Sequence, residues 1–340
     1  MFYRLWRPLL FLLPPETSHR LTIRALACLD HLVRVVPAAR AIDREAFTCM
    51  GLTFPNRIGL AAGFDKNGEC INALGLFGFG FIEVGTVTPK PQSGNPAPRL
   101  FRDTVARAVV NRLGFPNHGI DRLVGHLVNR RYGGVCGVNI GKNYDTPLEA
   151  AIADYLHCYE KVFPHADYVA LNVSSPNTPN LRELQRIDHL SPLLTELSTR
   201  RRFLLAGTGR GVPLLLKLAP ELNQTEVNAI AELAHKKLFD GVIATNTTVR
   251  RPSNSASHKE TGGLSGKPLH SFALASVRML RRTLPNDFPI IGVGGIMTPT
   301  DAIAMLDAGA DLVQIYTGMV FEGPSLPRRI QREFSRILPR

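Results

Sequence analysis

The sequence has 340 residues, 44% of them hydrophobic and 20% charged, and its formal net charge at pH 7 is +12. These proportions exclude a disordered chain and allow one large hydrophobic core or two smaller ones. The five cysteines form no C-x-x-C pair and are odd in number, so a disulfide framework or a cysteine-bound cluster is disfavoured. The positive charge fits nucleic acid, an acidic membrane surface or a small anionic substrate, but basic surfaces without such a role are also common.

Residues 1–45 differ in pattern from the rest of the chain. A short apolar run with interspersed arginines ends at Pro14 and Pro15, after which Thr17 or Ser18 is predicted to cap a second helix. The apolar residues of this second helix recur every three to four positions, at Leu21, Ala25, Cys28, Leu32 and Val36. Two amphipathic helices with arginine on their polar faces suit either an interfacial membrane anchor or a helical hairpin packed on the next domain. No run reaches the roughly 20 apolar residues of a membrane span, and no signal-peptide cleavage site is evident.

From residue 57 onward, short apolar or glycine-rich runs alternate with helical stretches. Runs of this kind are typical of strands that are buried on both faces of a parallel sheet. Their regular alternation with helices predicts an α/β protein in which residues 46–340 form a (β/α)8 TIM barrel, behind the N-terminal helical hairpin segment, rather than an open doubly wound sheet. The eight runs are Arg57–Gly63, Phe81–Val87, Val135–Gly141, Tyr168–Ser174, Val212–Ala219, Gly241–Thr247, Pro289–Ile296 and Leu312–Gly318.

Helices and insertions fill the space between these runs. Residues Thr225–Lys237 and Thr300–Ala308 carry clear helical patterns. A long insertion after the second run, Pro89–Arg131, includes the hairpin-like stretch Pro98–Val110, and a second insertion spans Arg250–Lys267. In a barrel, an insertion after the second strand lies over the catalytic face, so we expect the first of these segments to cover a site.

Every predicted strand ends in polar or glycine residues, where catalytic groups of such barrels lie. One such ending also suits a turn or a helix cap, but all of them together predict a ring of hydrogen-bonding groups around a flat polar ligand. Asn111, Asn172, Asn177 and Asn246 all fall in loops at the strand ends. Because each asparagine offers one acceptor and two donors without charge, the set suits a planar molecule with alternating C=O and N–H groups, such as a pyrimidine.

The cofactor is indicated by three features. The segments Gly292–Gly295 and Tyr316–Gly318 follow the last two runs, where TIM barrels bind phosphate. Lys217 is a cation in an apolar run, so it either forms an internal salt bridge or stabilises the anion of a reduced flavin. No cluster of His, Cys, Asp or Glu has the spacing of a metal site, so no metal is expected. One phosphate site beside a polar ring favours FMN over NAD or FAD.

The sequence resembles the class 2 dihydroorotate dehydrogenases, the quinone-dependent and membrane-associated enzymes, over nearly its full length. The resemblance rests on the motifs Gly59–Gly68, Asn111–Phe115, Asn172–Thr178, Ala244–Thr248 and Thr261–Gly266. It implies oxidation of (S)-dihydroorotate to orotate in de novo pyrimidine biosynthesis, with hydride passed to one FMN per chain and electrons passed on to a membrane quinone, ubiquinone or menaquinone. It also implies a monomer without a nucleic-acid partner that binds the membrane peripherally. No transit peptide is evident, which favours the cytoplasmic face of a bacterial inner membrane over a mitochondrial location.

The same resemblance assigns roles to individual residues, with Ser175 as the catalytic base and Thr178 as part of a proton relay. His19, Arg102 and Tyr316 would line the path of the quinone. Serine at position 175 favours class 2, since class 1 enzymes have cysteine there. The residues expected to bind FMN are Ala62, Gly63, Lys66, Thr86, Asn139, Asn172, Lys217, Thr245, Gly266, Gly295, Tyr316 and Thr317. Those expected to bind dihydroorotate are Lys66, Asn111, Arg112, Leu113, Gly114, Phe115, Asn172, Asn177, Asn246 and Thr247.

Two other classes of enzyme with flavin-binding barrels share some of these features. A dihydrouridine synthase would explain the basic charge, but those enzymes use a cysteine acid and carry an RNA-binding helical domain after the barrel, which this sequence does not show. A class 1 dihydroorotate dehydrogenase would use fumarate or, with a partner, NAD. Ser175 and the N-terminal helices argue against that reading.

Overall fold

The expected barrel is present in the computed structural model, which describes residues 2–33, 46–251 and 259–337. Eight parallel strands close in the order β10-β12-β13-β3-β4-β7-β8-β9, so neighbours in the chain are neighbours in the barrel. All eight predicted runs contain one of these strands, and the predicted TIM barrel is confirmed. The strands are β3 (Ile58–Leu60), β4 (Phe81–Val87), β7 (Val135–Ile140), β8 (Tyr168–Asn172), β9 (Leu214–Leu218), β10 (Gly241–Ala244), β12 (Ile290–Val293) and β13 (Leu312–Ile315).

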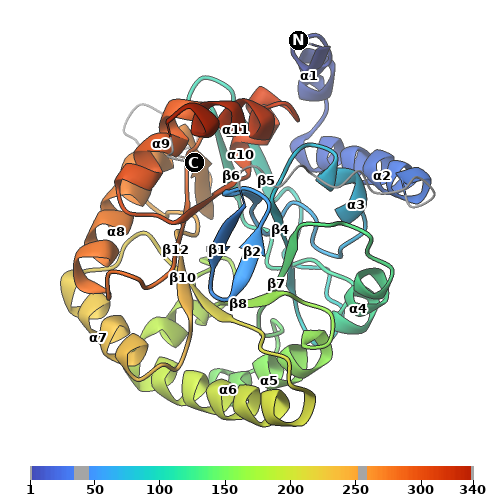
Figure 1. The fold of residues 1–340 in the computed structure, drawn as a ribbon. Coiled ribbons are helices and arrows are strands. Elements are labelled where there is room, and N and C mark those ends of the chain that lie inside the picture. Colours follow the sequence, from blue (N-terminus) through green and yellow to red (C-terminus); the bar gives the residue numbers. More distant parts are fainter. Residues whose placement is uncertain (1, 34–45, 252–258, 338–340) are drawn as a thin grey trace.

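Helices surround the barrel as an outer ring, and a short hairpin of strands β1 (Phe47–Cys49) and β2 (Leu52–Phe54) lies across one end of its axis (Figure 1). The expected helices near 225–237 and 300–308 are α7 and α9, and both begin with a capping box, at Asn223 and Thr298. The helices after the N-terminal pair are α3 (Ile71–Gly75), α4 (Ile120–Val128), α5 (Ala151–Val162), α6 (Ile187–Thr208), α7 (Gln224–His235), α8 (His270–Thr283), α9 (Pro299–Asp307), α10 (Thr317–Glu322) and α11 (Leu326–Ile337).

The two insertions meet in one small sheet. The hairpin-like stretch forms the antiparallel strands β5 (Leu100–Asp103) and β6 (Ala108–Asn111), as expected. The second insertion supplies β11 (Gly263–Gly266), which pairs antiparallel with β6. Because this pairing joins segments more than 150 residues apart in the chain, no local sequence pattern could predict it.

The N-terminal residues form α1 (Phe2–Leu12) and α2 (Pro15–Val33), which lie together outside the helical ring (Figure 1). The expected cap at Thr17 or Ser18 is wrong, because α2 already begins at Pro15, whose fixed backbone angle suits the first turn of a helix. Specific contacts hold α2 on the barrel. Asp30 accepts hydrogen bonds from Asn72 Nδ2 and from the backbone N–H of Ala73, both at 2.9 Å.

The apolar face predicted for α2 points outward. Leu21, Cys28 and Leu32 are exposed, and on α1 so are Trp6 and Leu12, the last with 81% of its surface accessible. Val36 lies outside the described residues, as does the expected boundary at residue 45. Within the ranges that the structure describes, no helix is both long and apolar enough to cross a bilayer. An apolar surface of this kind on a helix pair marks a contact with another apolar surface.

Candidate active site

The barrel interior is layered by the period of two along each strand, which turns alternate side chains inward. An apolar plug fills the barrel where the strands begin. It consists of Phe81, Tyr168, Leu215 and neighbouring residues, and it packs against Phe54 of the hairpin. Two residues further along β4, β9 and β13, the inward side chains are the polar Glu83, Lys217 and Gln314. This change places the site at the carboxyl ends of the strands, where TIM barrels carry their chemistry.

The first polar layer contains a buried ion pair. Lys217 Nζ on β9 lies 3.4 Å from Glu83 Oε1 on β4, and the two strands are not neighbours, so the pair spans the interior. Lys217 is 5% exposed and Glu83 is fully buried. Lys217 also lines the cavity above. The two readings of Lys217 therefore coexist, since it forms an internal salt bridge and faces a ligand site.

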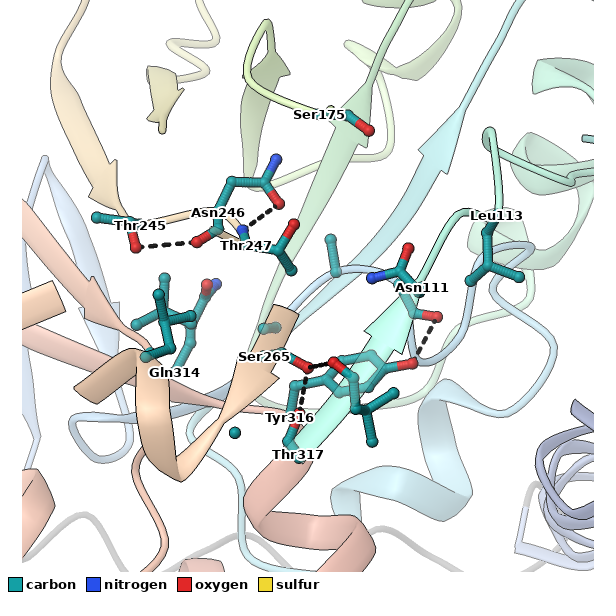
Figure 2. Close-up of a pocket in the computed structure, with 18 of the residues that line it drawn as sticks. Asn111, Leu113, Ser175, Thr245, Asn246, Thr247, Ser265, Gln314, Tyr316 and Thr317 are labelled. Atoms are coloured by element: carbon teal, nitrogen blue, oxygen red, sulfur yellow. Dashed lines mark hydrogen bonds between the residues drawn. The ribbon is translucent and has the colours of Figure 1, made fainter. Parts of the chain in front are cut away.

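A cavity with about 1040 Å³ of empty space lies above this layer. Figure 2 shows side chains converging on it from the ends of several strands and from both insertions. The predicted residues that line it are Ala62, Gly63, Lys66, Thr86, Asn111, Leu113, Gly114, Phe115, Asn172, Ser175, Asn177, Lys217, Thr245, Asn246, Thr247, Gly266, Gly295, Tyr316 and Thr317.

The four asparagines form two hydrogen-bonded pairs in this cavity. Asn246 Nδ2 donates to Asn172 Oδ1 at 3.1 Å, and Asn177 Nδ2 donates to Asn111 Oδ1 at 2.9 Å. Asn172 Nδ2 in turn donates to Thr86 Oγ1 at 2.8 Å. These bonds fix the orientation of the amides, so each pair presents its remaining donors and acceptors in a set pattern. The expected convergence of the asparagines is thus observed.

Ser175 follows β8 and is 5% exposed at the wall of the cavity. Its Oγ accepts a hydrogen bond from the backbone N–H of Asn177 at 3.3 Å. Thr178 is also buried, and its hydroxyl makes no hydrogen bond to any of the described residues. An unpaired buried hydroxyl is rare, so Thr178 has donor and acceptor capacity free for another group.

Lys66 is a cation at the edge of the cavity, and its Nζ donates to the carbonyl oxygen of Gly63 at 2.8 Å. Burial lowers the pKa of Lys66 to about 8. The side chain can therefore bind an anionic group, but its charge responds to mildly alkaline pH.

The glycine-rich end of β12 and the start of α10 form one corner of the cavity. A side chain at Gly295 would place its Cβ 2.6 Å from the backbone nitrogen of His270, so the chain approaches this closely only because residue 295 is glycine. On the other side, Thr317 Oγ1 and Ser265 Oγ are hydrogen-bonded at 2.8 Å (Figure 2). Backbone N–H groups and hydroxyls without charge suit a phosphate group.

A second cavity, with about 960 Å³ of empty space, lies between the N-terminal helices and the small sheet. It shares Leu100, Val109 and Tyr316 with the first cavity, so these three side chains form a common wall. His19 and Arg102, both expected on a quinone path, line it. The remaining lining is mostly apolar and includes Leu10, Phe11, Leu26, Phe64, Phe77, Met319 and Val320.

Burial dominates the electrostatics of the second cavity. It lowers the pKa of His19 to about 3, and the nearby charge of Lys66 acts in the same direction. His19 is therefore neutral at physiological pH. Burial also raises the pKa of the Tyr316 hydroxyl to about 12, so this phenol stays protonated. Arg102 lies over the ring of Phe11, 4.0 Å from its centroid, which ties α1 to β5.

The family model for dihydroorotate dehydrogenase matches residues 45–338. The chain belongs to the dihydroorotate dehydrogenase family. It is 50% identical to a dihydroorotate dehydrogenase (quinone) of Aromatoleum aromaticum over 328 residues, which cover 96% of this chain and 93% of that protein. It is 51% identical to one of Methylibium petroleiphilum over 330 residues, which cover 95% and 96%. The resemblance to the class 2 enzymes is confirmed.

A solved structure agrees with this family. The crystal structure of DHODH from Eimeria tenella in complex with ferulenol superposes with a TM-score of 0.87 at 38% identity, covering 95% of this chain and 91% of that one. The ligand-free form from the same organism gives a TM-score of 0.86 at 39% identity, with 95% of each chain covered. The similarity includes nearly the whole chain, not the barrel strands alone.

Three of the residues expected to bind FMN, bind dihydroorotate or relay a proton do not line the first cavity. Asn139 lies one layer deeper, where it accepts a hydrogen bond from Thr86 at 2.6 Å. Arg112 turns away to pair with Glu260 at 2.8 Å. Thr178 lies behind the wall. Glu83 was missed, although a carboxylate within the run Phe81–Val87 is the same signal that singled out Lys217.

Proposed function

We propose that this chain oxidises dihydroorotate to orotate, a step of pyrimidine biosynthesis, and that its electrons pass to a membrane quinone. The observation that carries the proposal is the pair of cavities with one shared wall. The first is polar, with amides and a serine at the ends of the strands, and the second is largely apolar. A polar substrate and a lipid-soluble acceptor can thus reach the same cofactor from different sides.

FMN fits the first cavity, at one molecule per chain. Its phosphate would occupy the corner at Gly266, Gly295 and Thr317, where a side chain at residue 295 would collide with backbone. Gln314 lines the cavity, and its buried side-chain oxygen has no hydrogen-bond partner in the described chain, so this oxygen would be available to the ring system. The remaining FMN contacts would come from Ala62, Gly63, Lys66, Thr86, Asn172, Lys217, Thr245 and Tyr316. Asn139 would act indirectly, because it accepts the hydrogen bond of the Thr86 hydroxyl and so fixes its orientation.

FMN held by these residues would supply the acceptor for the hydride that leaves C6 of dihydroorotate. The two asparagine pairs would read the alternating C=O and N–H groups of the substrate ring. Lys66 would bind the substrate carboxylate, and Phe115, Leu113 and Gly114 would close the site from the insertion after β4. Arg112 would act from outside the cavity, through its contact with Glu260.

Ser175 would take the proton from C5. Among the described residues that line the cavity with it there is no histidine, so the hydroxyl needs another outlet for its own proton. Thr178 has an unpaired hydroxyl two residues beyond Pro176, which makes it a suitable acceptor, directly or through a water. In this relay the C5–H bond would break as the proton moves to Ser175 Oγ, the proton of the serine hydroxyl would move to Thr178 Oγ1, and the threonine hydroxyl would pass its own proton on to water.

The second cavity would admit the quinone, past His19 and Arg102 to Tyr316. The exposed leucines of α1 and α2, together with Trp6, would rest in the lipid headgroup region beside its entrance. With this arrangement the protein would bind the membrane peripherally, and we propose that it does so as a monomer at the cytoplasmic face of the inner membrane. Residues 1–45 would thus serve as the membrane-binding and quinone-admitting segment, and residues 46–340 as the catalytic barrel.

Anaerobic mixing of the purified yellow protein with dihydroorotate tests the substrate half of the proposal. The flavin absorbance should bleach with one orotate formed per flavin. A protein that carries flavin and is not bleached by dihydroorotate would contradict the proposal, and a gel-shift with tRNA would then test the RNA-modifying alternative.

A further inference from the structure

Glu83 is the one residue of the first polar layer that bears a negative charge, in the part of the chain that the structure describes, yet it does not line the cavity. It is fully buried on β4, beneath Thr86 and beside the apolar plug. Taking a carboxylate out of water costs several kcal/mol unless it is paired and hydrogen-bonded. A carboxylate that is kept in the core at this cost indicates a role beyond packing.

The carboxylate is held by four side chains from four other strands. Oε1 accepts from Asn139 Nδ2 at 2.8 Å and lies 3.4 Å from Lys217 Nζ. Oε2 accepts from Tyr168 OH at 2.9 Å and from Gln314 Nε2 at 2.8 Å. Both oxygens are thus fixed, and the charge of Glu83 cannot move away from Lys217.

Three of the residues connected with Glu83 lead directly to the cavity. Lys217 and Gln314 line it, and Asn139 Oδ1 accepts from Thr86 Oγ1, which also lines it. The distance of 3.4 Å between Lys217 Nζ and Glu83 Oε1 is longer than the hydrogen bonds that Glu83 accepts from its neutral donors. Glu83 therefore neutralises the charge of Lys217 only in part. Its ammonium group can therefore stabilise negative charge on a ligand in the cavity, and the carboxylate of Glu83 weakens that stabilisation.

We propose that Glu83 is a positioning residue whose negative charge offsets Lys217 and thereby sets the reduction potential of the bound FMN. The proposal rests on the proposed function, since it needs FMN in the first cavity. Reduction of the flavin adds negative charge, which Lys217 stabilises and Glu83 opposes. The pair would hold the potential low enough for electrons to leave readily for the second acceptor.

The test is the midpoint potential of FMN in the purified holoenzyme, measured by spectroelectrochemistry. Glu83→Gln keeps the size and hydrogen-bonding reach of the side chain but removes its charge. It should favour reduced FMN by about tenfold in the equilibrium ratio, a rise of about 30 mV for a two-electron couple. An unchanged or lower potential in a folded, FMN-loaded E83Q would overturn the proposal, because a merely structural role predicts no rise.

Tyr168→Phe is the matched control. It removes one neutral donor from the same carboxylate and leaves the charge in place, so its potential should not rise. If Tyr168→Phe raised the potential as much as E83Q, loosening of the network and not the charge would be the cause, and the proposal would fail.

A second comparison covers the case in which E83Q does not fold with a lone buried ammonium. Lys217→Met and the double variant Lys217→Met/Glu83→Gln differ only in the charge of Glu83, and the double variant lacks both members of the buried pair. The double variant should have the higher potential, and equal potentials would reject the proposal. A protein that binds FMN and is bleached by dihydroorotate, but whose potential is insensitive to Glu83, would leave the proposed function intact and remove this inference alone.

Discussion

The rings of Phe64 and Tyr316 meet edge to face, with centroids 6.0 Å apart, beside the wall that the two cavities share. Phe64 in turn contacts the ring of His19 on α2, with centroids 5.5 Å apart. A continuous row of rings thus runs from the N-terminal helix to the edge of the polar cavity. The only residue of this row that lines both cavities is Tyr316.

Ser175→Ala should slow flavin reduction by dihydroorotate by about 10²–10⁴-fold, the usual contribution of a positioned general base. FMN should remain bound, because the structure gives the Ser175 hydroxyl no role in supporting the predicted phosphate corner. Anaerobic stopped-flow absorbance measures the rate, and the ratio of flavin to protein absorbance measures the FMN content. Reduction at nearly the normal rate would remove Ser175 from the role of base.

Lys66 should make substrate binding sensitive to pH. Its pKa of about 8 means that the ammonium is charged below that pH and loses its charge as the pH rises through it. The dissociation constant of orotate should therefore increase above pH 8, up to about tenfold per pH unit. Spectral titration of the oxidised holoenzyme measures it. Lys66→Arg, whose charge persists, should flatten the dependence, and the same slope in both proteins would exclude Lys66 as its source.

His19 should lower the free energy of unfolding in mild acid. Its pKa is about 3 in the folded chain and near 6.5 when unfolded, so the unfolded state binds a proton that the folded state does not between these pH values. Stability is unaffected above pH 6.5 and falls below it, by at most about 1.4 kcal/mol per pH unit. Urea unfolding at pH 7 and pH 5 should show a smaller loss for His19→Asn than for the unsubstituted chain. Equal losses would contradict the burial of a neutral His19.

The exposed leucines of α1 should carry the membrane binding. Leu5, Leu9 and Leu12 have more than half of their surface accessible, and replacing all three by Glu removes the apolar face without touching the cavity lining. Binding to vesicles that contain anionic lipid should weaken by about tenfold or more in a sedimentation assay. Phe203→Glu and Leu205→Glu alter exposed apolar residues of α6, away from α1, and serve as controls. Equal weakening by the controls would contradict a membrane role specific to α1.

The sequence predicts the strands well because each is buried on both faces, which leaves a nearly continuous apolar run. It predicts most of the site for a related reason. The carboxyl ends of parallel strands meet at one end of a barrel, so polar residues that end successive runs must converge. Asn111 and Asn246 are far apart in the chain and still line the same cavity.

The sequence does not predict features that depend on the direction of a side chain or on contacts between segments far apart in the chain. Arg112 adjoins the cavity residues Asn111 and Leu113 in the chain, but its side chain turns to Glu260, which spacing alone does not reveal. The apolar spacing of α2 fits a packed face and an exposed face equally well, and contacts such as that of Asp30 with Asn72 decide which side meets the barrel. The shared wall of the two cavities joins Leu100, Val109 and Tyr316, which no motif connects.

The measurement that tests the two-cavity proposal most directly is anaerobic double mixing, first with dihydroorotate and then with a short-chain ubiquinone, on a chain whose second cavity is blocked. Thr22→Trp places a large ring in that cavity, and Thr17→Trp on the same helix lies outside its lining and serves as the control. We predict equal bleaching by dihydroorotate in all three proteins, rapid recovery with quinone in the unsubstituted chain and in Thr17→Trp, and recovery slowed by about tenfold or more in Thr22→Trp, a barrier increase of about 1.4 kcal/mol. Undiminished recovery in a folded Thr22→Trp protein would contradict the proposal that electrons leave through the second cavity.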